Sequence, residues 1–296
     1  MPPKVNVIML EKTEIKGTLI PIGGHEDKGE NEYKGIDFIE KGILAHVVRE
    51  SGGNEAKIVV IPTASSIPVE VGEIYRNAFT TLGCKEVVVL NILERHEAES
   101  EENLKHIREA HCIMFSGGDQ SRIVTYIGGS TMHKIIQQRF ENEEDFVVAG
   151  TSAGAMAMAT EMIGGGSSSE ALQKGAVIMK KGMGFIPELI IDTHFIKRGR
   201  FGRMAEAVAM FPNLIGVGLA DDTGLIIKHC NEFKVIGSGM VVLFDPSHLT
   251  HNNHSILKTG TPMSMSNLVT HILANGDRFN IDNRKIDVLP VKEKFV

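Results

Sequence analysis

A serine in the middle of the chain stands in a sequence context typical of an enzymatic nucleophile. The segment Gly150-Thr-Ser-Ala-Gly154 is a G-x-S-x-G sequence that follows the apolar run 146–149 and precedes the helix-favouring run 155–159. A strand, a sharp turn and a helix in this order form a nucleophile elbow, which presents the serine hydroxyl at the end of a sheet. The alternative is a strand-to-helix turn whose glycines serve only packing. We predict that Ser152 is the nucleophile.

A base for this serine must come from elsewhere in the chain, because a serine hydroxyl is a poor nucleophile until a positioned base removes its proton. Of the twelve histidines, His194 is the best candidate. It lies just past the apolar strand Leu189–Asp192, and functional groups gather at the carboxyl edge of a sheet. A histidine at a strand end can equally be structural. We predict that His194 is the base.

Two adjacent aspartates, Asp221 and Asp222, are candidates for the carboxylate that orients the imidazole and stabilises its cation. They follow another apolar strand, Ile215–Leu219. Their Asp-Asp-Thr-Gly sequence also suits an ordinary turn before the next strand. The residues themselves therefore leave open which of the two carboxylates acts on His194.

Backbone N–H groups near the serine are candidates for an oxyanion hole, and the residue after the nucleophile usually supplies one of them. Here that residue is Ala153. A second N–H group could come from the loop 116–120, which follows an apolar strand and contains two glycines that allow close backbone approach. We predict that Ala153 and Gly118 bind the oxyanion, although Gly117-Gly118 taken alone indicates only a turn.

Four cations follow the predicted base within seven residues, in Lys197-Arg-Gly-Arg-Phe-Gly-Arg203. Arginine binds carboxylates through a bidentate fork, so this cluster beside His194 predicts a pocket for a substrate that carries carboxylates. The alternative interpretation is the solvated first turn of a helix.

The elements that must position these residues alternate between short apolar strands and helical patterns, as the βα units of a mostly parallel sheet require. We predict an α/β fold with a doubly wound sheet, flanking helices and extra C-terminal strands that are partly antiparallel. The glycine- and serine-rich stretch 164–169 predicts a flexible loop rather than a domain boundary, so we expect one domain over residues 1–296. The expected strands of the first half are 17–24, 57–62, 86–90, 112–115 and 146–149.

Composition narrows the class of protein further. The 296 residues are 42% hydrophobic and 23% charged, which is ordinary for a globular enzyme that needs no cofactor or metal to fold. The net charge of −6 argues against a nucleic-acid partner. We expect no membrane span and no signal peptide. The three cysteines lie far apart in apolar runs and predict buried thiols in a reducing compartment, the cytoplasm.

Six segments taken together resemble the cyanophycinases, in the serine peptidase family that also contains the aspartyl dipeptidases. The likeness runs in order over nearly the whole chain, and the spacing from Ser152 to His194 to Asp221 fits it. The segments are Gly-Gly-His-Glu-Asp-Lys at 23–28, Ser-Gly-Gly-Asp-Gln at 116–120, Gly-Thr-Ser-Ala-Gly-Ala at 150–155, Asp-Thr-His-Phe at 192–195, Arg-Gly-Arg-Phe-Gly-Arg at 198–203 and Gly-Val-Gly-Leu-Ala-Asp at 216–221.

The resemblance implies a fold related to class I glutamine amidotransferases and flavodoxin-like sheets, and usually a homodimer. It makes Ser152, His194 and Asp221 a catalytic triad. Thr193 stands where cyanophycinases commonly have Gln, Asp221 where they often have Glu, and His25 where Ala is frequent. The resemblance also implies that substrate is contacted by Gln120, Asp192, Arg198, Arg200 and Arg203, and Thr193 belongs to the same predicted pocket.

The expected function is therefore that of a serine-type exopeptidase that hydrolyses cyanophycin, a polymer of aspartate with arginine on its side chains, to β-Asp-Arg dipeptides. The substitutions at positions 193 and 221 leave the substrate linkage open. An α-aspartyl or isoaspartyl dipeptidase on the same fold is the nearest alternative. A non-catalytic, amidotransferase-like binding subunit is the alternative from another class.

Overall fold

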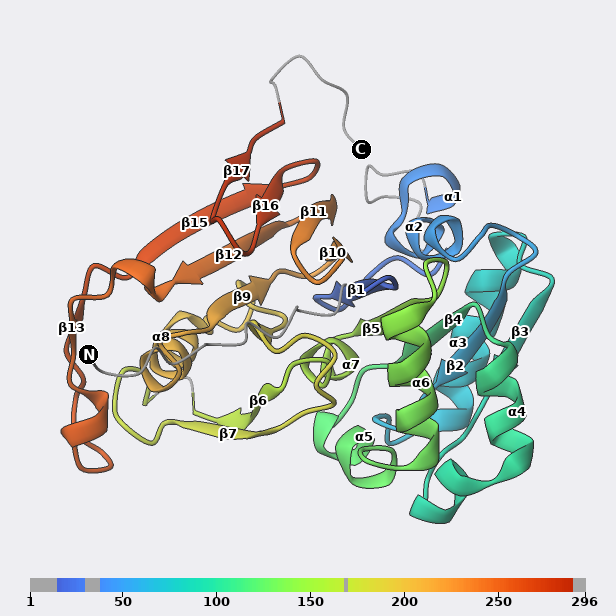
Figure 1. Ribbon diagram of the computed structural model, residues 1–296, viewed down its shortest axis with the longest axis horizontal. Coiled ribbons are helices and arrows are strands. Elements are labelled where there is room, and N and C mark those ends of the chain that lie inside the picture. Colours follow the sequence, from blue (N-terminus) through green and yellow to red (C-terminus); the bar gives the residue numbers. More distant parts are fainter. Residues whose placement is uncertain (1–14, 30–37, 168–169, 290–296) are drawn as a thin grey trace, which may run out of the picture.

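The computed structural model describes residues 15–29, 38–167 and 170–289. The described chain forms a large central sheet with helices packed against it and a second, smaller sheet beside it (Figure 1). The segment 1–10, for which we expect no signal peptide, lies outside the described residues, as do positions 168 and 169 of the predicted loop.

The central sheet has nine strands in the described residues, in the order β17-β16-β11-β10-β1-β5-β4-β2-β3. Five adjacent strands, from β1 to β3 in this order, are mutually parallel, which confirms the predicted parallel sheet of the first half. These strands are β1 (Thr18–Ile22), β2 (Lys57–Ile61), β3 (Glu86–Val89), β4 (Cys112–Phe115) and β5 (Val147–Thr151).

Helices cover both faces of this parallel part, because alternate side chains of each strand point to opposite faces. Ile58 and Val60 of β2 pack with residues of α2 and α3, whereas Val59 and Ile61 pack with residues of α4 and α6. The helices that precede the nucleophile candidate are α1 (Phe38–Lys41), α2 (Ile43–Glu50), α3 (Pro68–Thr81), α4 (Glu101–Glu109), α5 (Gln120–Tyr126) and α6 (Thr131–Asn142), with the 3-10 helix η1 (Arg95–Glu99) before α4.

The later strands divide between the two sheets, as the expectation of extending or flanking strands allowed. Antiparallel strands continue the central sheet beyond β1: β10 (Thr223–Lys228), β11 (Glu232–Gly237), β16 (Arg278–Asn280) and β17 (Ile286–Asp287). The second sheet has the order β15-β12-β9-β8 in the described residues, and its strands are β8 (Leu189–Asp192), β9 (Ile215–Leu219), β12 (Met240–Asp245) and β15 (Val269–Ala274). Since β8 and β9 are parallel neighbours, their carboxyl ends lie side by side.

The predicted flexible loop at 164–169 is wrong for its first half, because residues up to Gly166 belong to a strand. The strands β6 (Glu161–Gly166) and β7 (Val177–Lys181) pair as an antiparallel hairpin with an irregularity between Ile163 and Gly165. A Cβ atom on Gly166 would lie 2.3 Å from the carbonyl oxygen of Ala176. The glycines therefore allow close pairing of the two strands here.

One longer helix and several short elements remain. The helix α8 (Phe201–Met210) packs on the second sheet through Met204 and Val208. The short helix α7 (Ala153–Met156) directly follows β5, and the other short elements are η2 (Pro246–His248), β13 (His251–Asn252), η3 (His254–Ile256) and β14 (Met265–Ser266).

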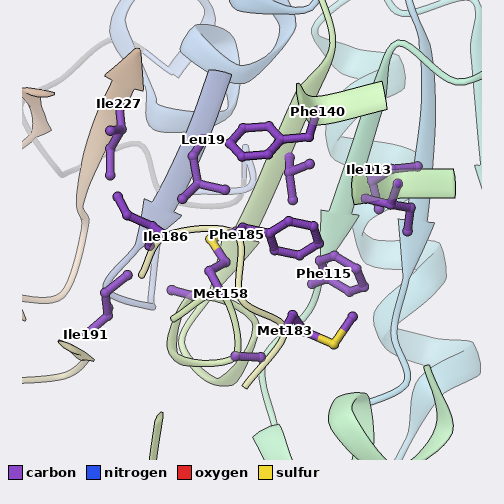
Figure 2. Close-up of a cluster of buried hydrophobic side chains, with 14 of the residues drawn as sticks. Leu19, Ile113, Phe115, Phe140, Met158, Met183, Phe185, Ile186, Ile191 and Ile227 are labelled. Carbon is purple, nitrogen blue, oxygen red and sulfur yellow. The ribbon is translucent and has the colours of Figure 1, made fainter. Parts of the chain in front are cut away.

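The largest hydrophobic cluster joins the two sheets. Figure 2 shows part of it, with Phe115 of β4, Phe140 of α6 and Ile191 of β8 among the labelled side chains. All three side chains are at most 1% exposed. The same cluster continues to Val217 of β9. Apolar burial therefore holds the carboxyl ends of β5, β8 and β9 near one another.

The cysteines are buried and free, as predicted for Cys84, Cys112 and Cys230. Burial raises the pKa of the Cys84 thiol to about 11 and that of Cys112 to about 12. Within the part of the chain that the structure describes, no helix is both long and apolar enough to cross a bilayer.

Candidate active site

The turn after β5 holds Ser152 in a strained backbone conformation. Its φ is 51° and its ψ is −112°, a region that costs a non-glycine residue on the order of 1–3 kcal/mol. The two glycines of the motif are required by close packing, since a Cβ atom on Gly154 would lie 2.5 Å from the carbonyl oxygen of Phe115. A Cβ atom on Gly150 would lie 2.7 Å from the carbonyl carbon of Gly154. This strand, strained turn and helix have the form of the predicted nucleophile elbow, although α7 has only four residues.

Three side chains from separate turns meet in one hydrogen-bonded series. Ser152 Oγ lies 2.8 Å from His194 Nε2, and His194 Nδ1 lies 2.5 Å from Asp221 Oδ1. Asp222 points elsewhere, where its carboxylate accepts a hydrogen bond from Ser238 Oγ. The structure therefore brings Asp221, and not Asp222, to the imidazole.

The loop after β1 joins the turns that carry these side chains. The backbone N–H of His194 donates to the carbonyl of Gly23 over 2.9 Å, and that of Asp222 donates to the carbonyl of Gly24 over 2.8 Å. Gly24 lies directly against the imidazole, because a Cβ atom on it would be 2.2 Å from His194 Cε1. These backbone contacts hold the ring of His194 against the loop after β1.

The surroundings of His194 favour a neutral imidazole. Its side chain is 8% exposed, and burial lowers the pKa of His194 below its usual 6.5. The hydrogen bond with Asp221 raises this pKa, whereas the positive charge of Arg198 lowers it again. A neutral ring at pH 7 is able to accept a proton from the serine hydroxyl.

A pocket of about 540 Å³ opens in front of Ser152 and His194. Gly117 and Gly118, which follow β4, form part of its wall. Gly118 has a φ of +142°, and a Cβ atom on it would lie 2.0 Å from the carbonyl oxygen of Ala64. Only glycine fits at this position, so the backbone itself lines the pocket there. Ala153, the other predicted oxyanion residue, begins α7 directly after the serine.

Of the predicted substrate contacts, Arg198 lines the pocket. Asp192, Arg200 and Arg203 instead form a cluster of ion pairs within the protein. Asp192 is fully buried, and its carboxylate accepts hydrogen bonds from Arg200 Nη1 over 3.0 Å and Arg203 Nε over 2.6 Å. Arg200 also donates to the carbonyl of Thr193 over 2.7 Å. This cluster fixes the turn immediately before His194.

The two other predicted contacts also bond within the protein. Thr193 is fully buried, and its hydroxyl donates to the sulfur of Met156 over 3.4 Å. The side-chain amide of Gln120 donates to the carbonyl of Ile163 over 2.8 Å and so joins α5 to the β6–β7 hairpin. Direct substrate contact stays a prediction for Gln120, Asp192, Thr193, Arg200 and Arg203.

Sequence reasoning missed a second charged group in the pocket wall. The fully buried carboxylate of Glu26 lies 3.1 Å from Lys28 Nζ and accepts hydrogen bonds from the hydroxyls of Tyr75 and, over 2.6 Å, of Thr151. Burial favours its protonated form, but Lys28 and the two hydroxyls bring the pKa of Glu26 below its usual 4.5. The segment 23–28 is one of those that carry the family resemblance, but the partner Tyr75 lies in α3 and carries no local signal.

One set of three potential metal ligands is present among the described residues, namely His25, His194 and Asp221. Two of the three belong to the hydrogen-bonded series above, and His25 is exposed beside them.

Fold and site together are those of an α/β serine peptidase, since a strained serine, a histidine and a carboxylate meet at the ends of parallel strands. Comparison with known proteins identifies the group within this class: residues 35–234 match the family described as Peptidase family S51. The chain belongs to peptidase family S51.

Curated relatives named cyanophycinase match this chain over nearly its full length. The chain is 35% identical over 271 residues to the cyanophycinase of Trichormus variabilis, covering 92% of this chain and 88% of that protein. It is 34% identical over 269 residues to the cyanophycinase of Geminocystis herdmanii, covering 91% of this chain and 95% of that protein. The fold matches the crystal structure of a peptidase from an acI-B1 Actinobacterium with a TM-score of 0.61 at 21% identity, covering 90% of this chain and 98% of that one.

Proposed function

We propose that the protein is a serine-type exopeptidase that hydrolyses cyanophycin and releases β-Asp-Arg dipeptides. One observation carries the proposal: the series Ser152, His194 and Asp221 opens onto a pocket whose wall carries the cations Lys28 and Arg198. A polymer of aspartate linked to arginine has carboxylates for these cations to bind. Curated relatives named cyanophycinase, which match more than nine-tenths of the chain, support this substrate.

In the proposed mechanism, Ser152 Oγ forms a bond to the carbonyl carbon of the scissile amide while its proton passes to His194 Nε2. Asp221 accepts a hydrogen bond from His194 Nδ1–H and stabilises the imidazolium that forms. The backbone N–H groups of Gly118 and Ala153 stabilise the oxyanion. His194 then gives the proton to the leaving amine, and water activated by the same histidine releases the acyl group from the serine.

We assign the fold to the class I glutamine amidotransferase-like, flavodoxin-like group, supported by helices on both sheet faces and by the nucleophile turn after the central strand β5. One folded unit is supported by the hydrophobic cluster that joins the two sheets. A homodimer in the cytoplasm completes the proposal, and three buried free thiols fit a reducing compartment.

The test is incubation of the purified protein with cyanophycin and identification of the soluble products by mass spectrometry. The wild type and Ser100→Ala should release β-Asp-Arg, because Ser100 makes no capping bond from its side chain at the start of α4. Ser152→Ala should release none. No release by the wild type would contradict the proposal. Hydrolysis of α-linked Asp-Arg or Asp-Leu instead of cyanophycin would indicate an aspartyl dipeptidase. If neither cyanophycin nor these dipeptides is hydrolysed, the result would indicate a binding subunit.

A further inference from the structure

The catalytic side chains share their surroundings with a histidine for which the proposed mechanism has no use. His25 follows β1 and is exposed, and the centre of its ring lies 5.1 Å from that of His194 in an edge-to-face arrangement. One ligand atom from each of His25, His194 and Asp221 can be chosen so that all three lie within 4.8 Å of one another. Two imidazoles and a carboxylate are a ligand set that Zn²⁺ and similar transition-metal ions prefer.

We propose that His25, His194 and Asp221 form an inhibitory binding site for a divalent transition-metal ion, with Zn²⁺ as the ion of best fit. A tetrahedral ion with bonds of about 2.0–2.1 Å to each ligand separates the ligand atoms by about 3.3 Å. His194 Nδ1 and Asp221 Oδ1, which lie 2.5 Å apart, must therefore separate slightly to admit the ion, while the imidazole of His25 approaches them. Most of this movement falls to the imidazole of His25, because that residue is exposed whereas His194 is buried.

The backbone already holds the three ligands together. His25 has a φ of 53°, a strained conformation for a histidine, and Gly23 and Gly24 just before it accept the backbone hydrogen bonds of His194 and Asp222. The three ligand-bearing turns are thus joined by direct hydrogen bonds rather than by long flexible loops. Such joining lowers the entropy that the site must lose when it binds an ion.

Bound metal would stop the proposed reaction through His194. A metal between Asp221 and His194 Nδ1 replaces the hydrogen bond that orients the ring, and a neutral imidazole bound through Nδ1 carries its proton on Nε2. That nitrogen can then no longer accept the serine proton. Magnesium prefers oxygen ligands in an octahedron, so it should not compete at a site with two nitrogens.

A neighbouring positive charge limits the affinity of the proposed site for Zn²⁺. Lys197 Nζ lies 3.6 Å from Asp221 Oδ2, and its side chain is 67% exposed. An incoming cation must displace this ammonium group, which can swing into solvent. The structure thus predicts that Lys197→Met binds Zn²⁺ more tightly than the wild type does.

The experiment is a titration of Ser152→Ala protein with Zn²⁺, followed by calorimetry, and the same titration in His25→Ala and His96→Ala backgrounds. His96 is a matched control, because it is a 75% exposed histidine in η1 that is paired with Glu94. His25→Ala should weaken binding at least about 10-fold, since loss of even an outer partner costs metal sites about 10- to 100-fold. His96→Ala should leave the affinity unchanged. Equal affinities in all three proteins would overturn the proposal.

A second readout uses the active enzyme, each variant being compared with its own metal-free rate. Zn²⁺, but not Mg²⁺, should inhibit the wild type reversibly on chelation, and His25→Ala should need at least about 10-fold more Zn²⁺ for the same inhibition. If the wild type and His25→Ala are inhibited at the same Zn²⁺ concentration, the proposed metal site is wrong. The calorimetric arm needs no turnover, so failure of the proposed peptidase function would not mimic failure of the metal site.

Discussion

The hydroxyl of Thr151 donates a hydrogen bond of 2.6 Å to the buried carboxylate of Glu26, so the residue before the proposed nucleophile is bound to the loop after β1. Tyr75 of α3 and Lys28 complete the surroundings of the same carboxylate. Glu26 and its partners thus join three elements around the pocket. Together these partners stabilise the buried negative charge of Glu26.

Replacement of Glu26 by Gln should destabilise the fold, because Lys28 loses its charged partner and a buried carboxamide cannot accept from both hydroxyls equally well. We expect a loss of about 1–3 kcal/mol in the free energy of unfolding, measured with urea. Glu55→Gln, which removes an exposed partner of Lys85, should cause no measurable change. Equal stability of the Glu26→Gln variant and the wild type would show that the buried network is dispensable.

The acid dependence of Glu26 follows from its lowered pKa. A carboxylate with a folded pKa below its unfolded value of 4.5 stabilises the protein above that value, and the contribution is lost as the pH falls through the folded pKa. The stability difference between the wild type and Glu26→Gln should therefore shrink below pH 4.5. A difference that stays constant on acidification would argue against an ionised Glu26.

The pH dependence of turnover should report the lowered pKa of His194. Only the neutral imidazole accepts the serine proton, so kcat/KM should rise with pH and reach half of its plateau below pH 6.5. Arg198 lowers the pKa of His194, and Arg198→Met should shift this acid limb toward higher pH. If the acid limb of Arg198→Met lies at the same pH as that of the wild type, Arg198 does not affect the pKa of His194.

The two cations of the pocket should govern recognition of charged substrate. Lys28→Met is expected to raise KM for a carboxylate-bearing peptide by about 10-fold with a smaller change in kcat, because a charge-assisted hydrogen bond contributes about 1.5–3 kcal/mol. Lys85→Met, a change in an exposed ion pair, serves as the control. For a substrate whose carboxylate is amidated, KM should no longer depend on Lys28. If the wild type and Lys28→Met have the same KM for the carboxylate-bearing peptide, Lys28 does not bind the substrate.

The cysteines should be inert in the folded enzyme. Burial raises the pKa of Cys84 to about 11 and of Cys112 to about 12, so little thiolate exists at pH 8, and Cys230 is buried as well. Iodoacetamide should leave activity intact and alkylate the three thiols only after denaturation. Loss of activity with alkylation of one native cysteine would point to a thiol in the reaction.

The sequence predicted the parallel strands and the nucleophile turn because both depend on short-range patterns. Short apolar runs locate β1 to β5, and the glycines on either side of Ser152 are the residues that the packing requires. The distant partners His194 and Asp221 followed from their places at strand ends and from the family resemblance. The residues alone did not distinguish Asp221 from Asp222, because adjacent side chains at a turn point in different directions. The resemblance favoured Asp221, which is the one that the structure brings to His194.

Other features of the site could not be read from local sequence. The predicted cationic pocket treated Arg198, Arg200 and Arg203 alike, but only the first lines the pocket, since the other two bond to buried Asp192. The pairing of Glu26 with Tyr75 joins residues 49 positions apart, on a loop and a helix. Such partners are set by how α3 packs on the sheet, which no local spacing encodes.

Reaction with a serine-directed phosphonate, followed by peptide mapping, tests most directly whether His194 activates Ser152. The account predicts an adduct on Ser152, and a rate of labelling that falls at least about 10³-fold in His194→Ala, since removal of the base leaves the hydroxyl protonated. Modification of a different residue, or labelling of Ser152 at the same rate without the imidazole, would contradict it.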